Sequence, residues 1–367
     1  MRKITSFRII LLSFSFLLFS ASAFAGFAPP VIYQAGNGPN CIAVEDFNRD
    51  GNIDIAVSNA FSNDVSVFLG NGDGTLQPAV NYAVGNSPGC VTQVFDRVGF
   101  TDLAVTNTLD NTVSVLLNNG DGTFQPAVSY GLGTGTSPVG VLTFDANGDG
   151  LYDLAVANSA GGTNNAGNIA MLLAVGDGTF QPAVNYGTGG TQPISLASDD
   201  FDLKSGQDLA VANFASNNVS VLLNDSTGKF RLSHIYRAGT SPTALAPLGT
   251  SLLVANSGSN NVTLLVLNSL GRLLHGKNFP AGEMPTSIQV SSLNSDSTLD
   301  FVTANENDDT VGVHLGLLHP PYFQKPTNYP TCSAPKFVAV AGTTHDGLLD
   351  LVVACSNGVG VMLNTGD

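Results

Sequence analysis

The chain has 367 residues, a net charge of −15 and 11% charged side chains, whereas apolar residues (43%) and Gly (41 residues) are plentiful. The acidic surplus disfavours nucleic acid and anionic membrane surfaces as partners, because both repel a negative protein. Scarce charge together with abundant Gly, Asn, Ser, Thr and Val is typical of a turn-rich all-β protein.

The first 25 residues have the features of a secretory signal peptide. A basic start precedes an apolar run over residues 9–19, and Ala23-Phe24-Ala25 matches a small-x-small cleavage site. The run is too short to span a membrane, and no later segment approaches about 18 uninterrupted apolar residues. We therefore expect cleavage after Ala25 and a secreted, periplasmic or extracellular product, residues 26–367, with a net charge of −18 and no membrane span.

Four cysteines follow: Cys41, Cys90, Cys332 and Cys355. They show no CxxC spacing, and an exported chain meets an oxidising compartment, so disulfides are favoured over zinc. A disulfide between Cys332 and Cys355 could cross-link the C-terminal unit internally. Cys41 and Cys90 hold matching positions in neighbouring repeats, so a disulfide between them could join the two repeats. The sequence leaves both pairings open.

Self-similarity is the dominant signal along the chain. A strand that ends in Asn recurs at intervals of 43 to 55 residues, with a seventh copy that ends in Ser. The ends of these seven strands are Asn59, Asn107, Asn158, Asn213, Asn256, Asn305 and Ser356. A proline opens each unit: Pro39, Pro88, Pro138, Pro193, Pro242, Pro285 and Pro335. Two independent markers therefore agree on seven repeats.

Each unit reads as four strands joined by an acidic loop, a short turn and a Gly-Asp turn such as the NGDG of residues 71–74. Four antiparallel strands per repeat predict the blades of a β-propeller. An outer strand stands once before the first proline, over residues 27–36, and the last unit lacks its own. We expect an all-β, seven-bladed propeller of four-stranded antiparallel blades, with the ring closed by the N-terminal strand.

Two acidic loops keep oxygen-bearing side chains at positions 1, 3, 5 and 9. They are DFNRDGNID, residues 46–54, and DANGDGLYD, residues 145–153. Such spacing suits a hard divalent cation. An EF-hand would need Glu at position 12, where Val57 and Val156 lie inside apolar runs that predict buried strands.

These loops, the D-[IL]-A-V strands and the NGDGTFQPAV turns resemble the FG-GAP/VCBS repeats, which also occur in the propellers of integrin α-subunits. The resemblance covers residues 27–367 and implies a seven-bladed propeller with calcium in some inner hairpin loops. The implied calcium ligands are Asp46, Asn48, Asp50, Asn52 and Asp54 in one loop, and Asp145, Asn147, Asp149, Leu151 and Asp153 in the other. Asn52 and Leu151 would contribute backbone carbonyls. Crowded carboxylates repel one another unless a cation neutralises them.

The remaining copies have lost ligands. Asp200, Asp202 and Asp208 remain in the fourth unit, but Lys204 at position 5 favours a salt-bridged pseudo-site over a metal. Asn294, Asp296 and Asp300 are a weaker candidate in the sixth unit. The second unit is shortened, the fifth has no loop, and the seventh keeps only Asp346, Gly347 and Asp350, so we expect these three to be metal-free.

No catalytic constellation is visible. Gly85-Asn86-Ser87-Pro88-Gly89 matches the GxSxG elbow, but Pro88 has no N–H to serve an oxyanion hole. The five His residues are scattered without metal-ligand spacing. We therefore expect a monomeric, calcium-stabilised, non-catalytic binding or scaffold module for an unidentified protein or glycan. The alternatives are a hydrolase or lyase that acts on polysaccharide at a propeller face, and a lectin.

Overall fold

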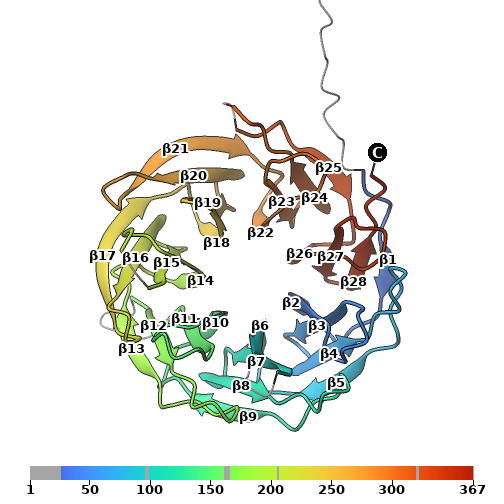
Figure 1. Cartoon of the computed structure of the whole chain (residues 1–367), viewed down its shortest axis with the longest axis horizontal. Helices are drawn as coiled ribbons and strands as arrows, with labels where there is room; N and C mark the ends of the chain where they lie inside the picture. The colour runs from blue at the N-terminus through green and yellow to red at the C-terminus, as the bar shows by residue number, and fades with distance from the viewer. Residues whose placement is uncertain (1–25, 96–98, 161–165, 205, 320–321, 367) are drawn as a thin grey trace, which may run out of the picture.

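The computed structural model of the protein describes residues 26–95, 99–160, 166–204, 206–319 and 322–366. The predicted signal peptide lies outside these ranges. Within them, 28 strands form seven four-stranded antiparallel sheets arranged as blades around a ring (Figure 1). The predicted all-β, seven-bladed propeller is therefore confirmed. Over the same ranges no helix has the length and apolar character needed to cross a membrane.

The chain passes from the axis outwards in each of the first six blades. Blade 1 contains β2 (Pro39–Glu45), β3 (Asp54–Asn59), β4 (Asp64–Phe68) and β5 (Val80–Ala83). Blade 2 contains β6 (Pro88–Phe95), β7 (Thr101–Asn107), β8 (Thr112–Leu116) and β9 (Val128–Gly131). Blade 3 contains β10 (Pro138–Phe144), β11 (Asp153–Asn158), β12 (Asn168–Leu172) and β13 (Val184–Gly187). Blade 4 contains β14 (Pro193–Asp199), β15 (Asp208–Asn213), β16 (Asn218–Asn224) and β17 (Phe230–Arg237).

The last blade is assembled from both ends of the chain. Blade 5 contains β18 (Pro242–Leu248), β19 (Ser251–Asn256), β20 (Asn261–Leu267) and β21 (Leu273–Pro280). Blade 6 contains β22 (Pro285–Ser291), β23 (Asp300–Asn305), β24 (Thr310–His314) and β25 (Thr327–Pro330). Blade 7 contains β26 (Phe337–Ala341), β27 (Asp350–Cys355), β28 (Gly358–Met362) and, as its outer strand, β1 (Val31–Tyr33). Ile32 pairs with Gly360, so the N-terminal strand closes the ring as predicted.

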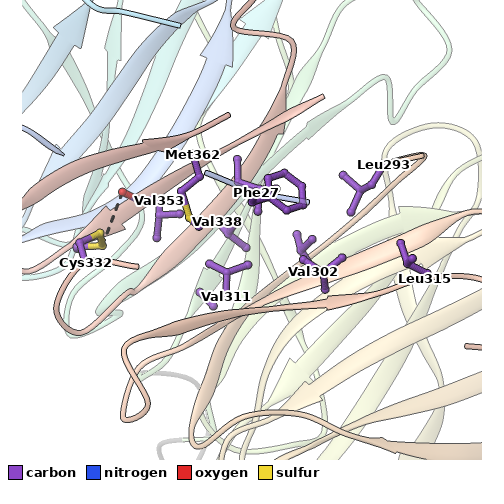
Figure 2. Close-up of a cluster of buried hydrophobic side chains, with 13 residues drawn as sticks. Phe27, Leu293, Val302, Val311, Leu315, Cys332, Val338, Val353 and Met362 are labelled. Carbon is purple, nitrogen blue, oxygen red and sulfur yellow. Dashed lines mark hydrogen bonds between the residues drawn. A yellow bond between two sulfur atoms is a disulfide. The ribbon is translucent and has the colours of Figure 1, made fainter. Parts of the chain in front are cut away.

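The core lies between consecutive blades. Every residue of β3 and of β27 is buried, because both faces of an inner strand pack against neighbouring blades. Between blades 6 and 7, Phe27 packs with Val302, Val311, Val338 and Val353 (Figure 2). The continuous apolar runs of the sequence are therefore explained by two-sided burial.

In blades 2 and 5, the Asn that ends the second strand joins three segments. In blade 2, Asn107 Oδ1 accepts the N–H of Gly85 at 3.0 Å, and Asn107 Nδ2 donates to Thr112 Oγ1 and Ser114 Oγ at 2.9 and 2.8 Å. Asn256 makes the same set of bonds in blade 5. The repeated Asn thus ties the incoming connector to the third strand, which gives this sequence marker its physical cause.

A second repeated contact holds each blade to the next. An Asn or Asp with positive φ in the turn between second and third strands accepts an N–H from the following connector. Asn63 Oδ1, for example, accepts the N–H of Ser87 at 2.9 Å. The equivalent acceptors are Asn111, Asn217, Asn260 and Asp309. Asn and Asp suit this position because they tolerate the left-handed region. Ser87, the GxSxG serine, therefore belongs to a blade connector.

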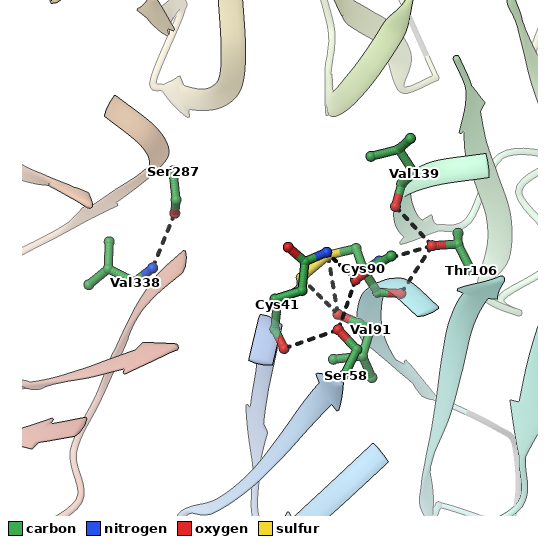
Figure 3. The surroundings of a disulfide bond; sticks show 10 residues. Cys41, Ser58, Cys90, Val91, Thr106, Val139, Ser287 and Val338 are labelled. Atoms are coloured by element: carbon green, nitrogen blue, oxygen red, sulfur yellow. Dashed lines mark hydrogen bonds between the residues drawn. A yellow bond between two sulfur atoms is a disulfide. The ribbon is translucent and has the colours of Figure 1, made fainter. Parts of the chain in front are cut away.

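Both disulfides left open by the sequence are formed. Cys41 and Cys90, 49 residues apart, join the inner strands of blades 1 and 2 (Figure 3). Cys332 and Cys355, 23 residues apart, join the connector into blade 7 to the end of β27. Two disulfides are consistent with an oxidising compartment.

Candidate metal-binding loops

The acidic loops lie on one face of the ring. We call the segment between the first and second strands of each blade its A–B loop; loop 1 is residues 46–54 and loop 3 is residues 145–153. Because every blade is antiparallel, all A–B loops and all turns between third and fourth strands lie on the same side. The connectors and the turns between second and third strands lie on the other side.

Loop 1 is held by bonds from its own backbone to its acidic side chains. Asp46 accepts the N–H groups of Asp50 and Gly51 at 3.1 and 2.8 Å, and Asp50 Oδ1 accepts that of Asn52 at 2.8 Å. Gly51 has φ +89°, which favours glycine at position 6. The five predicted ligand residues therefore belong to one tightly wound loop.

Loop 3 repeats this arrangement. Asp145 accepts the N–H groups of Gly148 and Gly150 at 2.7 and 2.9 Å, and Asp149 Oδ1 accepts that of Leu151 at 2.8 Å. Asn147 Nδ2 donates to Asp149 Oδ2 at 2.9 Å. Both loops thus contain the carboxylate, amide and carbonyl groups that a calcium ion prefers. Among the described residues, however, the three carboxylates of each loop do not converge as those of loop 4 do.

The position-9 aspartate has a structural role that the motif alone does not reveal. Asp54 is fully buried, and its carboxylate accepts the N–H of Phe47 at 2.9 Å and that of Gly70 at 2.8 Å. It therefore joins its own A–B loop to the end of the third strand. The equivalent residues that take both bonds are Asp153, Asp208, Asp300 and Asp350. The bond pair persists in blades 6 and 7, where other ligands are lost.

Burial dominates the electrostatics of these aspartates. It raises the pKa of Asp54, Asp153 and Asp208 to about 6 each, while the backbone N–H donors oppose the shift. Burial also raises the pKa of Asp300. A nearby cation would favour the charged form and reverse this direction. Burial therefore disfavours the charged form of the position-9 aspartates, and a cation would oppose this effect.

Loop 4 brings its carboxylates closest together. Asp200, Asp202 and Asp208 each place an oxygen within 4.8 Å of the others, the one such trio among the described residues. This cluster can hold a metal ion. Lys204 makes the predicted salt bridge, with Nζ 2.8 Å from Asp202 Oδ2, but its side chain is 71% exposed. An exposed ion pair of this kind contributes little stability and leaves the lysine free to move away.

Three of the loops also accept a side-chain hydrogen bond from the following blade. Asn118 of blade 2 donates to the Phe47 carbonyl of loop 1 at 2.9 Å and to Thr101 of its own blade at 3.1 Å. Asn224 bonds loop 3 through the Ala146 carbonyl, and Asn364 bonds loop 6 through that of Leu293. The sequence-based predictions missed these bonds; their signal is an Asn at the end of the third strand or two residues beyond it, at 118, 224 and 364.

The other loops match their degraded sequences. Asp296 in loop 6 accepts the N–H of Thr298, and Asp346 in loop 7 accepts that of Leu348, as in ordinary Asx turns. In blade 5, Leu248 pairs directly with Ser251 and no acidic loop is present. Part of the shortened second loop, residues 96–98, lies outside the described residues.

The centre of the ring holds a cavity of about 560 Å³. Inner-strand residues of all seven blades line it, including Asn40, Gln93, Ser195, Thr243 and Gln289. Among the described lining residues the titratable side chains are Glu306 and Lys336, which bond each other; Cys41 and Cys90 form their disulfide. The described lining of the cavity therefore offers few groups for acid–base chemistry.

The chain contains FG-GAP-like repeats, and the model of this repeat matches residues 46–96 and 95–156, which include loops 1 and 3. Among curated proteins none matches the chain.

Solved structures share the fold. They include BBS1N in complex with ARL6DN, at 12% identity and TM-score 0.67, where the match covers 93% of this chain and 97% of that one. The periplasmic gluconolactonase PpgL of Pseudomonas aeruginosa is 16% identical, with TM-score 0.65 and coverage of 87% and 88%. A protein from Lactobacillus plantarum is 17% identical, with TM-score 0.63 and coverage of 83% and 89%. These chains differ in role, so the likeness concerns the fold alone.

Proposed function

Starting from a propeller of FG-GAP-like repeats, we propose that the chain is an exported, calcium-stabilised scaffold that binds an extracellular or cell-surface partner, a protein or a glycan, without catalysis. The observation that carries this proposal is the lining of the central cavity. Propeller enzymes need several titratable groups converging on one reacting atom. Here Glu306 and Lys336 are bonded to each other, and the other described lining side chains are apolar, neutral or disulfide-bonded.

The loops support the calcium part of the proposal. Asp46, Asn48, Asp50, Asn52 and Asp54 would hold one ion, and the corresponding residues of loop 3 a second. The ion would neutralise clustered carboxylates whose burial penalises their charged form. Binding to the folded chain alone adds stability by mass action, about 2.7 kcal/mol at a free calcium concentration of 100 Kd.

Thermal unfolding with calcium and with EDTA tests this part. We expect calcium to raise the Tm of the wild type, and the double variant Asp50→Ala/Asp149→Ala to lose most of this increase. Position 5 is chosen because replacing the position-9 aspartates would also remove their structural bonds. Asp121→Ala, in a turn on the same face, is the matched control and should keep the full response. An unchanged wild-type Tm and no calcium by elemental analysis would reject the metal sites.

The binding role is tested against the enzymatic and lectin alternatives with one set of substrates. The purified protein is assayed with sugar lactones and with anionic and neutral polysaccharides, and is applied to a glycan array. We expect no turnover. Turnover that Glu306→Gln abolishes would establish an enzyme and overturn the scaffold proposal. Selective glycan binding without turnover would assign the partner to the glycan class.

A further inference from the structure

Positive charge is concentrated in one stretch of this acidic protein. Residues 226–282 contain no Asp or Glu, although the whole chain has 28 of them. The same stretch carries five of the thirteen basic residues: Lys229, Arg231, Arg237, Arg272 and Lys277. All five side chains are exposed. The charge of the protein is therefore unevenly distributed, with a local positive area on a mostly negative surface.

This area maps to the outer strands of two adjacent blades, β17 and β21, which we call the basic rim (Figure 1). Exposed apolar side chains lie among the cations: Leu232 is 41%, Ile235 46% and Leu274 54% exposed. β17 has Arg231 near its start and Arg237 at its end, whereas Arg272 directly precedes β21 and Lys277 lies within it. The rim therefore combines positive charge with uncovered apolar surface.

The basic rim also offers unpaired backbone. β17 and β21 are eight residues long, whereas the outer strands of the other five blades have three or four. Each is the last strand of its sheet, so the N–H and C=O groups on its outer edge have no strand partner. A long free edge is a template for a further strand.

Protection against aggregation is the simplest account of charge on an edge strand. Protection requires charge but not a particular sign, and the chain as a whole carries 28 acidic residues against 13 basic ones. It does not explain why 57 consecutive residues, 226–282, exclude Asp and Glu while they collect five cations. The sign is better explained by an acidic ligand.

We infer that the basic rim docks an extended, acidic segment of a partner polypeptide, which adds as a fifth strand to the edge of β17. This inference rests on the proposed scaffold function and names the kind of partner. Arg231 and Arg237 would pair with acidic side chains at the two ends of the segment. Leu232 and Ile235 would be covered by its apolar side chains. A polysaccharide offers neither a complementary backbone nor apolar side chains, so the rim fits a polypeptide better.

The test uses a fluorescent peptide with glutamates at both ends and valines between them, long enough to span β17, in titrations with the calcium-loaded full chain. Two comparison peptides carry lysine in place of glutamate or N-methylated valine in place of valine. A third comparison ligand is a sulfated oligosaccharide. Anionic phospholipid vesicles are a fourth. The variants are Arg231→Glu/Arg237→Glu and, as a single charge reversal just before β25 of blade 6, Lys325→Glu.

We expect the acidic peptide to bind, the lysine peptide not to bind, and N-methylation to abolish binding because it blocks the edge hydrogen bonds. The double variant should weaken binding about tenfold or more, and Lys325→Glu less than about twofold. The inference would be overturned if the N-methylated peptide bound equally well or if the acidic peptide did not bind. It would also be overturned if the oligosaccharide or the vesicles bound more tightly than the peptide. Self-association that the double variant abolishes would assign the rim to a second copy of the chain instead. These binding outcomes are independent of the turnover assays that test the proposed function.

Discussion

Replacement of His314 by leucine should stabilise the propeller. His314 lies in β24 with 0% exposure, its ring stacks on Phe301 at 4.0 Å between centroids, and neither ring nitrogen has a hydrogen-bond partner. Strand pairing gives its equivalents in the other six blades, and all six are apolar: Phe68, Leu116, Leu172, Leu222, Leu265 and Met362. The site is therefore an apolar position that holds a polar ring.

The expected magnitude has two parts. An unsatisfied buried polar group costs about 1–3 kcal/mol, part of which the lost ring stacking offsets, so we expect a net gain of about 1 kcal/mol at neutral pH. Burial also lowers the pKa of His314 from 6.5 to about 3. Between these values the unfolded chain binds a proton that the folded chain does not, so this residue's contribution to stability falls as pH falls. The loss of folding free energy is about 1.4 kcal/mol per pH unit below 6.5, so it reaches about 2 kcal/mol at pH 5.

Urea unfolding of the wild type and His314→Leu at pH 7.5 and pH 5 measures both parts. The stability difference should favour the variant at both pH values and be about 2 kcal/mol larger at pH 5. His319→Leu, at an exposed position, is the control and should show no such change. A difference that is equal at the two pH values, or a variant that is less stable at both, would refute the reasoning.

Three further predictions concern bonds that hold the blades. Asp153→Asn leaves one buried N–H facing another donor and should cost about 1–3 kcal/mol in urea unfolding, whereas Asp177→Asn in an exposed turn should cost little. Asn118→Ala removes the hydrogen bond from blade 2 to loop 1, so we expect a lower Tm and weaker calcium binding to that loop in calorimetry. Cys332→Ala/Cys355→Ala should cost about 2–4 kcal/mol, and thiol reductant should then shift the Tm less than in the wild type.

The repeat architecture was predictable because each blade copies the same local bonds. The Asn that ends the second strand donates a bond to the start of the third strand in blades 1 to 6, so the residue recurs there. With the related seventh copy it predicted seven blades. The two acidic loops were visible for the same reason. Position 9 was predicted only as a ligand, yet Asp350 keeps both backbone bonds in a loop that has lost its other ligands. That persistence was the signal of its structural role.

Contacts between distant residues were not predictable in this way. Asn118 bonds Phe47, 71 residues away, and no local pattern connects them. The convergence of Asp200, Asp202 and Asp208 depends on side-chain directions that a motif does not encode. The basic rim was present in the sequence as a run without acidic residues, but only the strand order places its cations on two free edges.

The position of β1 in blade 7 has a consequence for the order of events during folding. In a chain made from its N-terminus, this strand appears before blades 1 to 6, and its partner β28 appears after them. Local pairing can complete blades 1 to 6 one after another, but blade 7 must wait for β28. Until then the incomplete ring exposes the apolar sides of blades 1 and 6, the surfaces most exposed to misassembly. The pairing of β28 with β1 therefore turns an open row of blades into a ring.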